Sequence, residues 1–194
     1  STDKFNYIWT IWDLCFRYDI EFPDFYRNRE FERRERLYKT ALIKAIKLIT
    51  DSEFTKKKIV RRYGIDEKRI AVFPLLPSVS VNISGHEYRH NYIDIKKKYG
   101  IKGDYIFYPA QFWPHKNHVY ILEGLKILKE RYNKTVNAVF VGSERGNLSF
   151  VIKKADELGL KNQIHYLGFV ENKEMPYLYK QALALVMPTY LGPT

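Results

Sequence analysis

The sequence has little cysteine, a deficit of acidic residues and no long apolar run. One cysteine among 194 residues, Cys15, excludes an internal disulfide framework and a cysteine-based zinc cluster. No run of residues is long enough for a membrane-spanning helix. We therefore expect a cytoplasmic protein. The 22 acidic residues against 33 lysines and arginines leave a net charge of +11, which favours anionic partners such as phosphorylated small molecules, nucleic acid or a membrane surface.

The sequence does contain a regular alternation of short β-favouring runs and amphipathic helical segments. We expect strands at 6–14, 46–50 and 69–73 with helices at 28–45 and 51–63. Further strands are expected at 105–108, 136–141, 163–167 and 183–187, with helices at 91–99, 118–131, 148–158 and 174–181. This order predicts an α/β fold with parallel sheets flanked by helices. The Pro-, Ser-, Asn- and Gly-rich stretch 74–87 indicates a linker between two domains, 1–80 and 81–194.

The stretch 105–121 predicts a buried strand that leads through a short polar turn into a helix. In open α/β sheets such turns bind ligands, because the following helix directs free N–H groups and its positive dipole end at them. Lys116 adds a positive charge that suits a phosphate, and a solvated lysine at a helix start is the alternative. Asn117 is expected to cap the helix. His115 and His118 are either acid–base groups or polar turn residues.

Several stretches have to be considered together: residues 45–74, residues 108–117 and the strand ends at 139–143, 165–170 and 185–189. In this order they resemble the group 1 retaining glycosyltransferases, which have the GT-B fold. The resemblance covers almost the whole chain. It implies two Rossmann-like domains, of which 1–80 is the C-terminal part of an acceptor-side lobe that is incomplete. Residues 81–194 would be the nucleotide-sugar-binding domain, truncated at its C-terminal end.

The resemblance also implies a donor site. Lys116 falls at the position of the lysine that binds the donor diphosphate, and Gln111 stands where the family commonly has an arginine. The Gln111 amide retains a hydrogen-bond donor. A glycine at 142 is explained by close backbone approach to a ligand or by a simple turn. The residues implied to contact the nucleotide and its base are Gly142, Ser143, Phe169 and Val170.

The chain departs from the family pattern at two further places. The family's paired glutamates should begin near Gly192, where no glutamate stands, so no catalytic residue is assigned. In the first domain Trp12 replaces the histidine of a strand end that often reads His-Asp-Leu. Asp13 beside it is either a substrate contact or a turn former. We expect this chain by itself to bind a nucleoside diphosphate with little or no sugar transfer.

The implied function is transfer of a hexose, with mannose as one candidate, from a nucleoside-diphosphate sugar to a glycan or lipid-linked acceptor with retention. A lysine and a helix N-terminus would stabilise the departing diphosphate, and no Asp-x-Asp motif is present, so we expect neither a metal nor another cofactor. The basic charge predicts peripheral attachment to the inner face of an anionic membrane. The alternative is a non-catalytic basic module that binds nucleic acid or nucleotide through the clusters at 56–58, 61–62 and 96–98, which solvated helix faces also explain.

Overall fold

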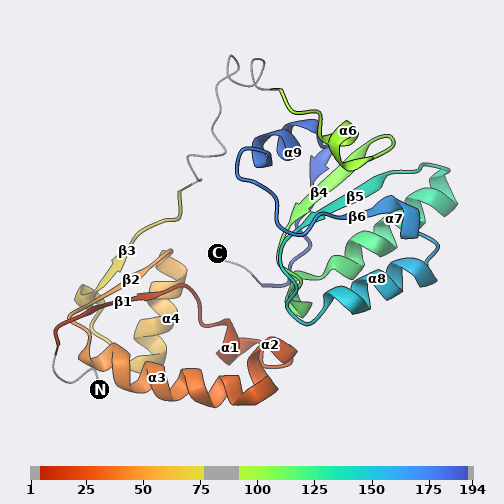
Figure 1. Cartoon of the computed structure of the whole chain (residues 1–194). Helices are drawn as coiled ribbons and strands as arrows, with labels where there is room; N and C mark the ends of the chain where they lie inside the picture. Colours follow the sequence, from red (N-terminus) through yellow and green to blue (C-terminus); the bar gives the residue numbers. More distant parts are fainter. Residues whose placement is uncertain (1–4, 77–91, 192–194) are drawn as a thin grey trace. The chain divides into compact units, whose positions relative to one another are not determined.

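The computed structural model describes residues 5–76 and 92–191 (Figure 1). They divide into two compact units, one formed by residues up to 76 and the other ending at Tyr190, and each is described by itself. The predicted domain boundary after residue 80 and most of the predicted linker 74–87 lie outside the described residues.

The first unit is built on a three-stranded parallel sheet in the order β1-β2-β3. Its strands are β1 (Ile8–Ile11), β2 (Lys47–Thr50) and β3 (Ile70–Val72). Its α-helices are α1 (Cys15–Tyr18), α2 (Pro23–Tyr26), α3 (Glu30–Lys44) and α4 (Glu53–Tyr63), with 3-10 turns η2 (Arg27–Arg29) and η3 (Glu67–Arg69). The short helices α1 and α2 were not expected from the sequence.

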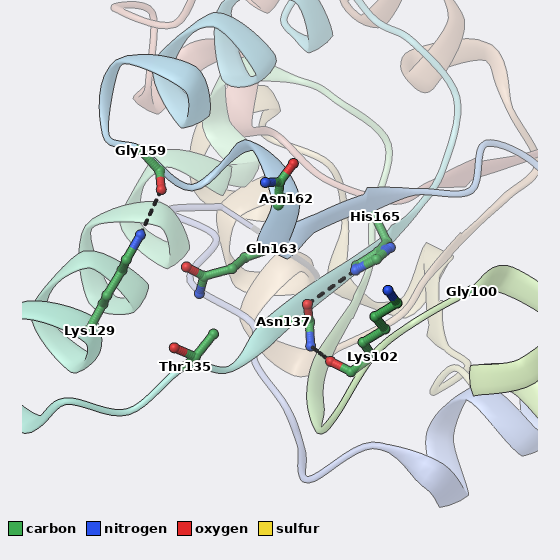
Figure 2. Close-up of a pocket in the computed structure, with 9 residues that line it drawn as sticks. All are labelled: Gly100, Lys102, Lys129, Thr135, Asn137, Gly159, Asn162, Gln163 and His165. Carbon is green, nitrogen blue, oxygen red and sulfur yellow. Dashed lines mark hydrogen bonds between the residues drawn. The ribbon is translucent and has the colours of Figure 1, made fainter.

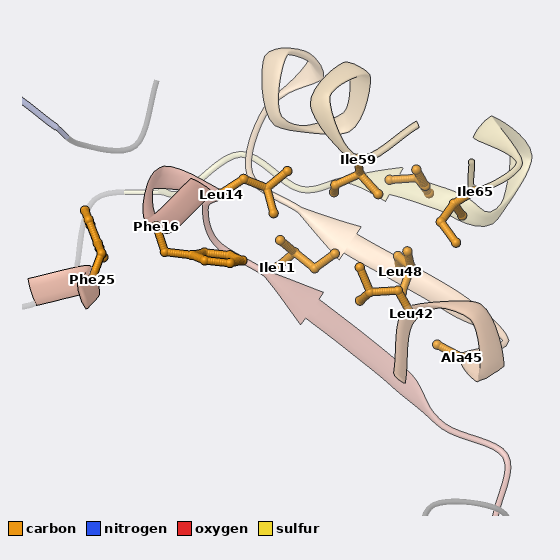
Figure 3. Packing of buried hydrophobic residues seen from close by; sticks show 10 residues of the cluster. Ile11, Leu14, Phe16, Phe25, Leu42, Ala45, Leu48, Ile59 and Ile65 are labelled. Carbon is orange, nitrogen blue, oxygen red and sulfur yellow. The ribbon is translucent and has the colours of Figure 1, made fainter. Parts of the chain in front are cut away.

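Local signals explain where the elements of this unit begin and end. Ser52 caps α4, since its Oγ accepts from the Thr55 N–H at 3.2 Å, and Gly64 ends that helix with a φ of 64°. The strand β1 was predicted to be buried but is only partly covered: Ile8 is 62% exposed. The reason is that β1 lies at the edge of the sheet. The core, shown in Figure 3, consists of Ile11, Leu14, Phe16, Phe25, Leu42, Ala45, Leu48, Ile59, Ile65 and Ile70.

The second unit is built on a four-stranded parallel sheet in the order β6-β5-β4-β7. Its strands are β4 (Tyr105–Pro109), β5 (Asn137–Val141), β6 (Ile164–Tyr166) and β7 (Ala184–Leu185). Its α-helices are α6 (Ile95–Tyr99), α7 (His118–Tyr132), α8 (Leu148–Glu157) and α9 (Met175–Gln181), with 3-10 turns η5 (Pro114–Lys116) and η6 (Lys161–Gln163).

Helices cover both faces of this sheet, because neighbouring residues of each strand point to opposite sides. Tyr108 and Phe140 pack with residues of α7 and α8, whereas Phe107 and Val139 pack with residues of α6 and α9. Burial on both sides explains why β4 and β5 read as nearly continuous apolar runs. The α/β fold with parallel sheets flanked by helices is thus confirmed.

Two predicted boundaries in this unit were wrong. The helix expected from residue 91 begins at Ile95, because Asp94 Oδ1 accepts from the Lys97 N–H at 2.9 Å and caps it there. The strand expected over 183–187 pairs with β4 only at Ala184 and Leu185. Within residues 5–76 and 92–191, no helix is long and apolar enough to cross a membrane.

Candidate functional site at the strand ends

The turns that follow β4, β5 and β6 are joined by backbone hydrogen bonds. The Phe112 N–H donates to the Ser143 carbonyl at 3.0 Å, and the Gly142 N–H donates to the Gly168 carbonyl at 2.9 Å. The strands are parallel and in register up to Pro109 and Val141, so their carboxyl ends meet at one edge of the sheet. The structure therefore brings together the sequence segments that were predicted to share a site.

Gly142 occupies a conformation and a space that only glycine suits. Its φ is 153°, and a Cβ there would lie 2.3 Å from the Ala110 carbonyl oxygen and 2.8 Å from the Gln111 nitrogen. The close approach is therefore to the backbone of the neighbouring turn. This contact accounts for the glycine without a ligand and places Gln111 directly beside Gly142.

Ser143 presents an unusual buried hydroxyl. Its carbonyl accepts from Phe112, but its Oγ is buried without a hydrogen-bond partner among the described residues. An unpaired buried hydroxyl costs roughly 1–3 kcal/mol, so such a group is normally satisfied by a water or a ligand. Ser143 Oγ is thus a buried hydroxyl of this edge whose hydrogen bond no described residue supplies.

Backbone contacts on both sides fix Lys116. Its N–H donates to the Trp113 carbonyl at 3.0 Å, and its carbonyl accepts from the Tyr108 hydroxyl at 2.9 Å. The lysine therefore stands directly before the first turn of α7. Asn117 is the N-cap residue of α7, as predicted, and its carbonyl accepts from the Tyr120 N–H at 3.1 Å. Its side chain does not cap the helix: the residue is left-handed with a φ of 54°, and its Nδ2 donates to the Pro188 carbonyl at 3.2 Å. Asn117 thus ties the turn after β7 to the turn after β4.

His118 supports the turn from inside the core. It is 0% exposed and stacks on Phe112, with ring centroids 4.1 Å apart and planes 13° apart. Burial lowers the pKa of His118 to about 4; the nearby Ala110 carbonyl opposes this shift and the Lys116 charge adds to it. The ring is therefore neutral at pH 7 and has no access to a substrate. Of the two sequence interpretations, the structure favours the turn residue.

His115 holds the fourth turn through its backbone. Its carbonyl accepts from the Tyr190 N–H at 2.9 Å and from Thr189 Oγ1 at 3.3 Å. Its ring lies nearly parallel to the indole of Trp113, with centroids 6.5 Å apart. The residues that follow β7 are in this way held against the segment that carries Lys116.

A cation that the sequence analysis did not consider, Arg145, lies over the ring of Trp113. The Arg145 guanidinium carbon is 5.5 Å from the Trp113 ring centroid, and Trp113 Nε1 donates to Gln111 Oε1 at 2.9 Å. Gln111 is exposed, and its Nε2 donates to no partner among the described residues. The turn 142–146 could have suggested Arg145, since it follows a strand end, but its stacking on Trp113 depends on the fold.

The two residues predicted to border a base differ in environment. Phe169 is 92% exposed and follows Gly168, whose φ is 64°. The side chain of Val170 is 6% exposed and packs in the core with Tyr177 and Leu178. A contact of Val170 with a base therefore stays a prediction. Gly192, near which the family's first glutamate was expected, lies outside the described residues.

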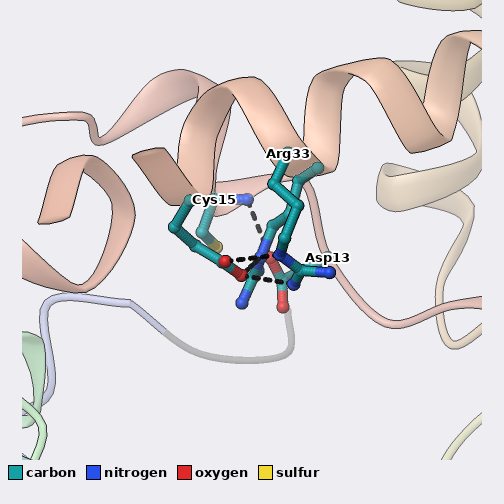
Figure 4. Close-up of polar contacts among 5 residues, drawn as sticks. Asp13, Cys15 and Arg33 are labelled. Atoms are coloured by element: carbon teal, nitrogen blue, oxygen red, sulfur yellow. Dashed lines mark hydrogen bonds and ion pairs between the residues drawn. The ribbon is translucent and has the colours of Figure 1, made fainter. Parts of the chain in front are cut away.

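Asp13, in the first unit, forms a local turn (Figure 4). Its Oδ1 accepts from the Cys15 N–H at 2.9 Å. Arg33 in the same view instead pairs with Glu30, with Nε 2.7 Å from Oε2. Burial, with help from the Asp13 charge, raises the pKa of the Cys15 thiol to about 11 and keeps it protonated. These contacts support the turn-forming interpretation of Asp13 and leave Cys15 without nucleophilic character.

A cavity of about 490 Å³ lies at the opposite edge of the second sheet, where β5 and β6 begin (Figure 2). Asn137 Nδ2 donates to the Lys102 carbonyl at 2.8 Å, and the His165 ring lies 3.2 Å from Asn137 Oδ1. Lys129 donates to the Gly159 carbonyl at 2.9 Å. Asn137 and Lys129 thus hold the loops of this edge together, and none of the predicted site residues lines the cavity.

The parallel sheets flanked by helices define an α/β fold of the Rossmann-like class. The family described as glycosyl transferases group 1 matches residues 76–193. The chain belongs to this family.

A curated relative is the O-antigen chain mannosyltransferase RfbU of Salmonella typhimurium strain LT2, which is 26% identical over 168 residues. The match covers 87% of this chain and 42% of the relative, so the chain spans less than half of that protein's length.

Solved structures share the fold at low sequence identity. WaaG, a glycosyltransferase involved in lipopolysaccharide biosynthesis, superposes with a TM-score of 0.73 at 16% identity over 96% of this chain and 51% of its own. HepE of Anabaena in complex with UDP-glucose gives a TM-score of 0.68 at 14% identity over 97% of this chain and 48% of its own. These likenesses support the GT-B fold class predicted from the sequence.

Proposed function

We propose that the protein takes part in the transfer of a hexose from a nucleoside-diphosphate sugar to a glycan or lipid-linked acceptor. The observation that carries this proposal is the hydrogen-bonded set of turns after β4, β5, β6 and β7. They gather Lys116, Gln111, Gly142 and Ser143 at the edge where α/β sheets bind ligands. Family membership supports the reaction class.

The donor diphosphate would lie at the turn after β4. As the glycosidic bond breaks, negative charge grows on the departing diphosphate, so a fixed cation stabilises the transition state more than the ground state. Lys116 and the first N–H groups of α7 supply that stabilisation in the proposal, and no metal or other cofactor is required. Arg145 and the Gln111 amide take the place of the family's arginine.

The nucleotide would lie against the turns after β5 and β6. Ser143 Oγ is the buried donor that a ligand would satisfy, and Phe169 offers an exposed ring beside the base. A crystallised structural neighbour, HepE, contains UDP-glucose, which supports a nucleoside diphosphate as the ligand class. The name of the Salmonella relative supports mannose as the sugar and a surface polysaccharide as the product. Retention of configuration follows by analogy with the family.

The cellular setting stays a prediction from composition. A cytoplasmic location was expected from the single cysteine, and peripheral attachment to an anionic membrane from the net charge of +11. Sedimentation with anionic vesicles that weakens with salt is the expected result for that attachment.

The alternative of a basic nucleic-acid-binding module loses part of its support, because three of its eight clustered cations form ion pairs. Lys56 lies 3.1 Å from Glu67, and Lys96 lies 2.8 Å from Asp104. Lys98 pairs with the buried carboxylate of Glu174. These lysines have acidic partners and are not poised for phosphates of a strand.

A calorimetric panel tests the proposal. Uridine, guanosine and adenosine diphosphates are titrated into the 194-residue chain, and one of them is expected to bind with clear preference. Amide chemical shifts should then change in residues 110–117, 142–146 and 167–170. Equal, salt-sensitive binding of all three nucleotides and of an oligonucleotide, with no shifts in these turns, would favour the basic module.

A further inference from the structure

A basic cavity lies in the first unit between α1 and α4. Its volume is about 330 Å³, and its lining residues are Arg17, Tyr18, Arg61 and Arg62. No carboxylate is among them. Because both helices belong to the same compact unit, the cavity is formed without any contribution from the turns of the second unit.

The charge of one lining arginine is compensated inside the protein. Arg17 is 12% exposed and pairs with the carboxylate of Glu35, which is 10% exposed. Glu35 also lies 3.3 Å from Lys39 Nζ and accepts from the Tyr63 hydroxyl at 3.3 Å. The Arg17–Glu35 pair is therefore a structural part of the cavity wall. Because Glu35 already has two cationic partners, Arg17 and Lys39, it does not neutralise a further cation of the cavity.

The other two arginines lack such compensation. Arg61 and Arg62 are exposed on the last turn of α4, and neither forms an ion pair or a hydrogen bond with another described residue. Lys58, one turn earlier, lies 4.6 Å from the Tyr18 ring centroid and 4.1 Å from that of Phe54, and it pairs with no described carboxylate. The cavity thus combines two free guanidinium groups with a third cation on its aromatic rim.

We propose that this cavity binds a phosphate group, with Arg61 and Arg62 as its principal ligands. The planar guanidinium fork matches two phosphate oxygens, and a phosphomonoester carries about 1.5 to 2 negative charges, which two arginines neutralise. A volume of about 330 Å³ accommodates a phosphate with a small substituent. The group comes from a soluble phosphorylated molecule or from a phospholipid headgroup. This site is additional to the proposed donor site.

The first test titrates inorganic phosphate into the 194-residue chain and follows backbone amide shifts by NMR. Lys116→Ala is present in every variant, so that the proposed donor site contributes little. Shifts are expected in α1 and α4. In Arg61→Ala/Arg62→Ala the affinity should fall at least about tenfold, and Arg61→Lys/Arg62→Lys should lie between, because lysine keeps the charge but not the fork.

Arg36→Ala/Arg131→Ala is the matched control, since both arginines are exposed and form no ion pair with a described residue. It removes the same charge and should leave phosphate affinity unchanged. A fall as large as that of Arg61→Ala/Arg62→Ala would overturn the proposal, and so would phosphate shifts that bypass α1 and α4.

A second arm identifies the source of the phosphate. Phosphatidylcholine vesicles with and without phosphatidic acid are sedimented with the same variants. Sedimentation that requires phosphatidic acid, is lost in Arg61→Ala/Arg62→Ala and is kept in the control assigns the cavity to a lipid headgroup. Phosphate shifts without sedimentation assign it to a soluble phosphorylated molecule. An equal loss of sedimentation in both double variants would show that vesicle binding depends on net charge alone, and it would contradict binding of a lipid headgroup in the cavity.

Discussion

Gly142 and Ala110 are in direct backbone contact: a methyl group at position 142 would lie 2.3 Å from the Ala110 carbonyl oxygen. The contact joins the turn after β5 to the turn after β4. It continues in the hydrogen bond from Phe112 to Ser143, 3.0 Å long. The close approach of these two turns at the candidate donor site therefore requires a residue without a side chain at position 142.

Gly142→Ala should separate these two turns. The added methyl group meets backbone rather than a flexible side chain, and the φ of 153° disfavours alanine, so we expect a loss of about 3 kcal/mol in the free energy of unfolding. Nucleoside-diphosphate binding should weaken as well. Urea unfolding and calorimetry measure the two effects.

Gly124→Ala provides the comparison. Gly124 lies within α7, and a Cβ there would have no neighbour within 4 Å. Alanine should therefore stabilise the helix by about 0.5–1 kcal/mol, with nucleotide binding unchanged. If the two glycine variants lowered stability alike, the backbone contact at Gly142 would not be the cause.

Local patterns predicted much of the second unit. In β4, Tyr105, Phe107 and Tyr108 are 2% exposed or less, and Ile106 and Pro109 are partly buried. On α7, Leu122 and Leu125, which recur at helical spacing, are 1% exposed or less. Such signals are carried by neighbours in sequence, which is why the succession of strands and helices along the chain and the parallel sheet followed from them. Helix starts were less predictable: Asp94 caps α6 later in the chain than expected, and the Asn117 side chain donates to the Pro188 carbonyl instead of capping α7.

The features that the sequence did not predict depend on contacts between segments that are distant in the chain. The Asn117 side chain reaches the Pro188 carbonyl, and Arg145 stacks on Trp113 from the next turn. Neither contact can be predicted from the residues that neighbour it in sequence. The short helices α1 and α2 escaped prediction because four residues give too little periodicity to read.

Arg145→Ala should weaken nucleoside-diphosphate binding about three- to tenfold. Arg145 stacks on Trp113, and Trp113 donates a hydrogen bond to Gln111, which stands where the family commonly has an arginine. The Arg145 charge would therefore lie near the donor phosphates. Arg145→Lys should recover part of the loss, because the charge remains. Lys153→Ala, on the exposed side of α8, removes the same charge and should have no effect. Titration calorimetry at two salt concentrations distinguishes these outcomes.

His118 predicts a pH dependence of stability. Its pKa is about 4 in the folded chain against an ordinary 6.5, so the unfolded chain binds more protons between these values. The contribution is fully present above pH 6.5 and is lost as the pH falls towards 4, by up to about 3 kcal/mol.

His118→Leu removes this titration and two buried ring nitrogens that lack a hydrogen-bond partner among the described residues. The variant should therefore unfold at nearly constant urea concentration from pH 7 to pH 4.5, while the parent chain becomes less stable. Parallel pH profiles for the two proteins would show that burial of His118 does not control the slope.

Lys116→Ala tests the placement of the diphosphate most directly. The backbone of Lys116 is held by Trp113 and Tyr108, so truncation of its side chain should leave the turn intact. Loss of one charge-assisted contact to phosphate should cost about 1.5–3 kcal/mol, or roughly ten- to a hundredfold in affinity. Calorimetry with the preferred nucleoside diphosphate measures this loss, and the corresponding nucleoside, which lacks phosphates, should bind both proteins equally. Unchanged diphosphate affinity in Lys116→Ala would place the phosphates at another turn, and Arg145 would then become the first cation to examine.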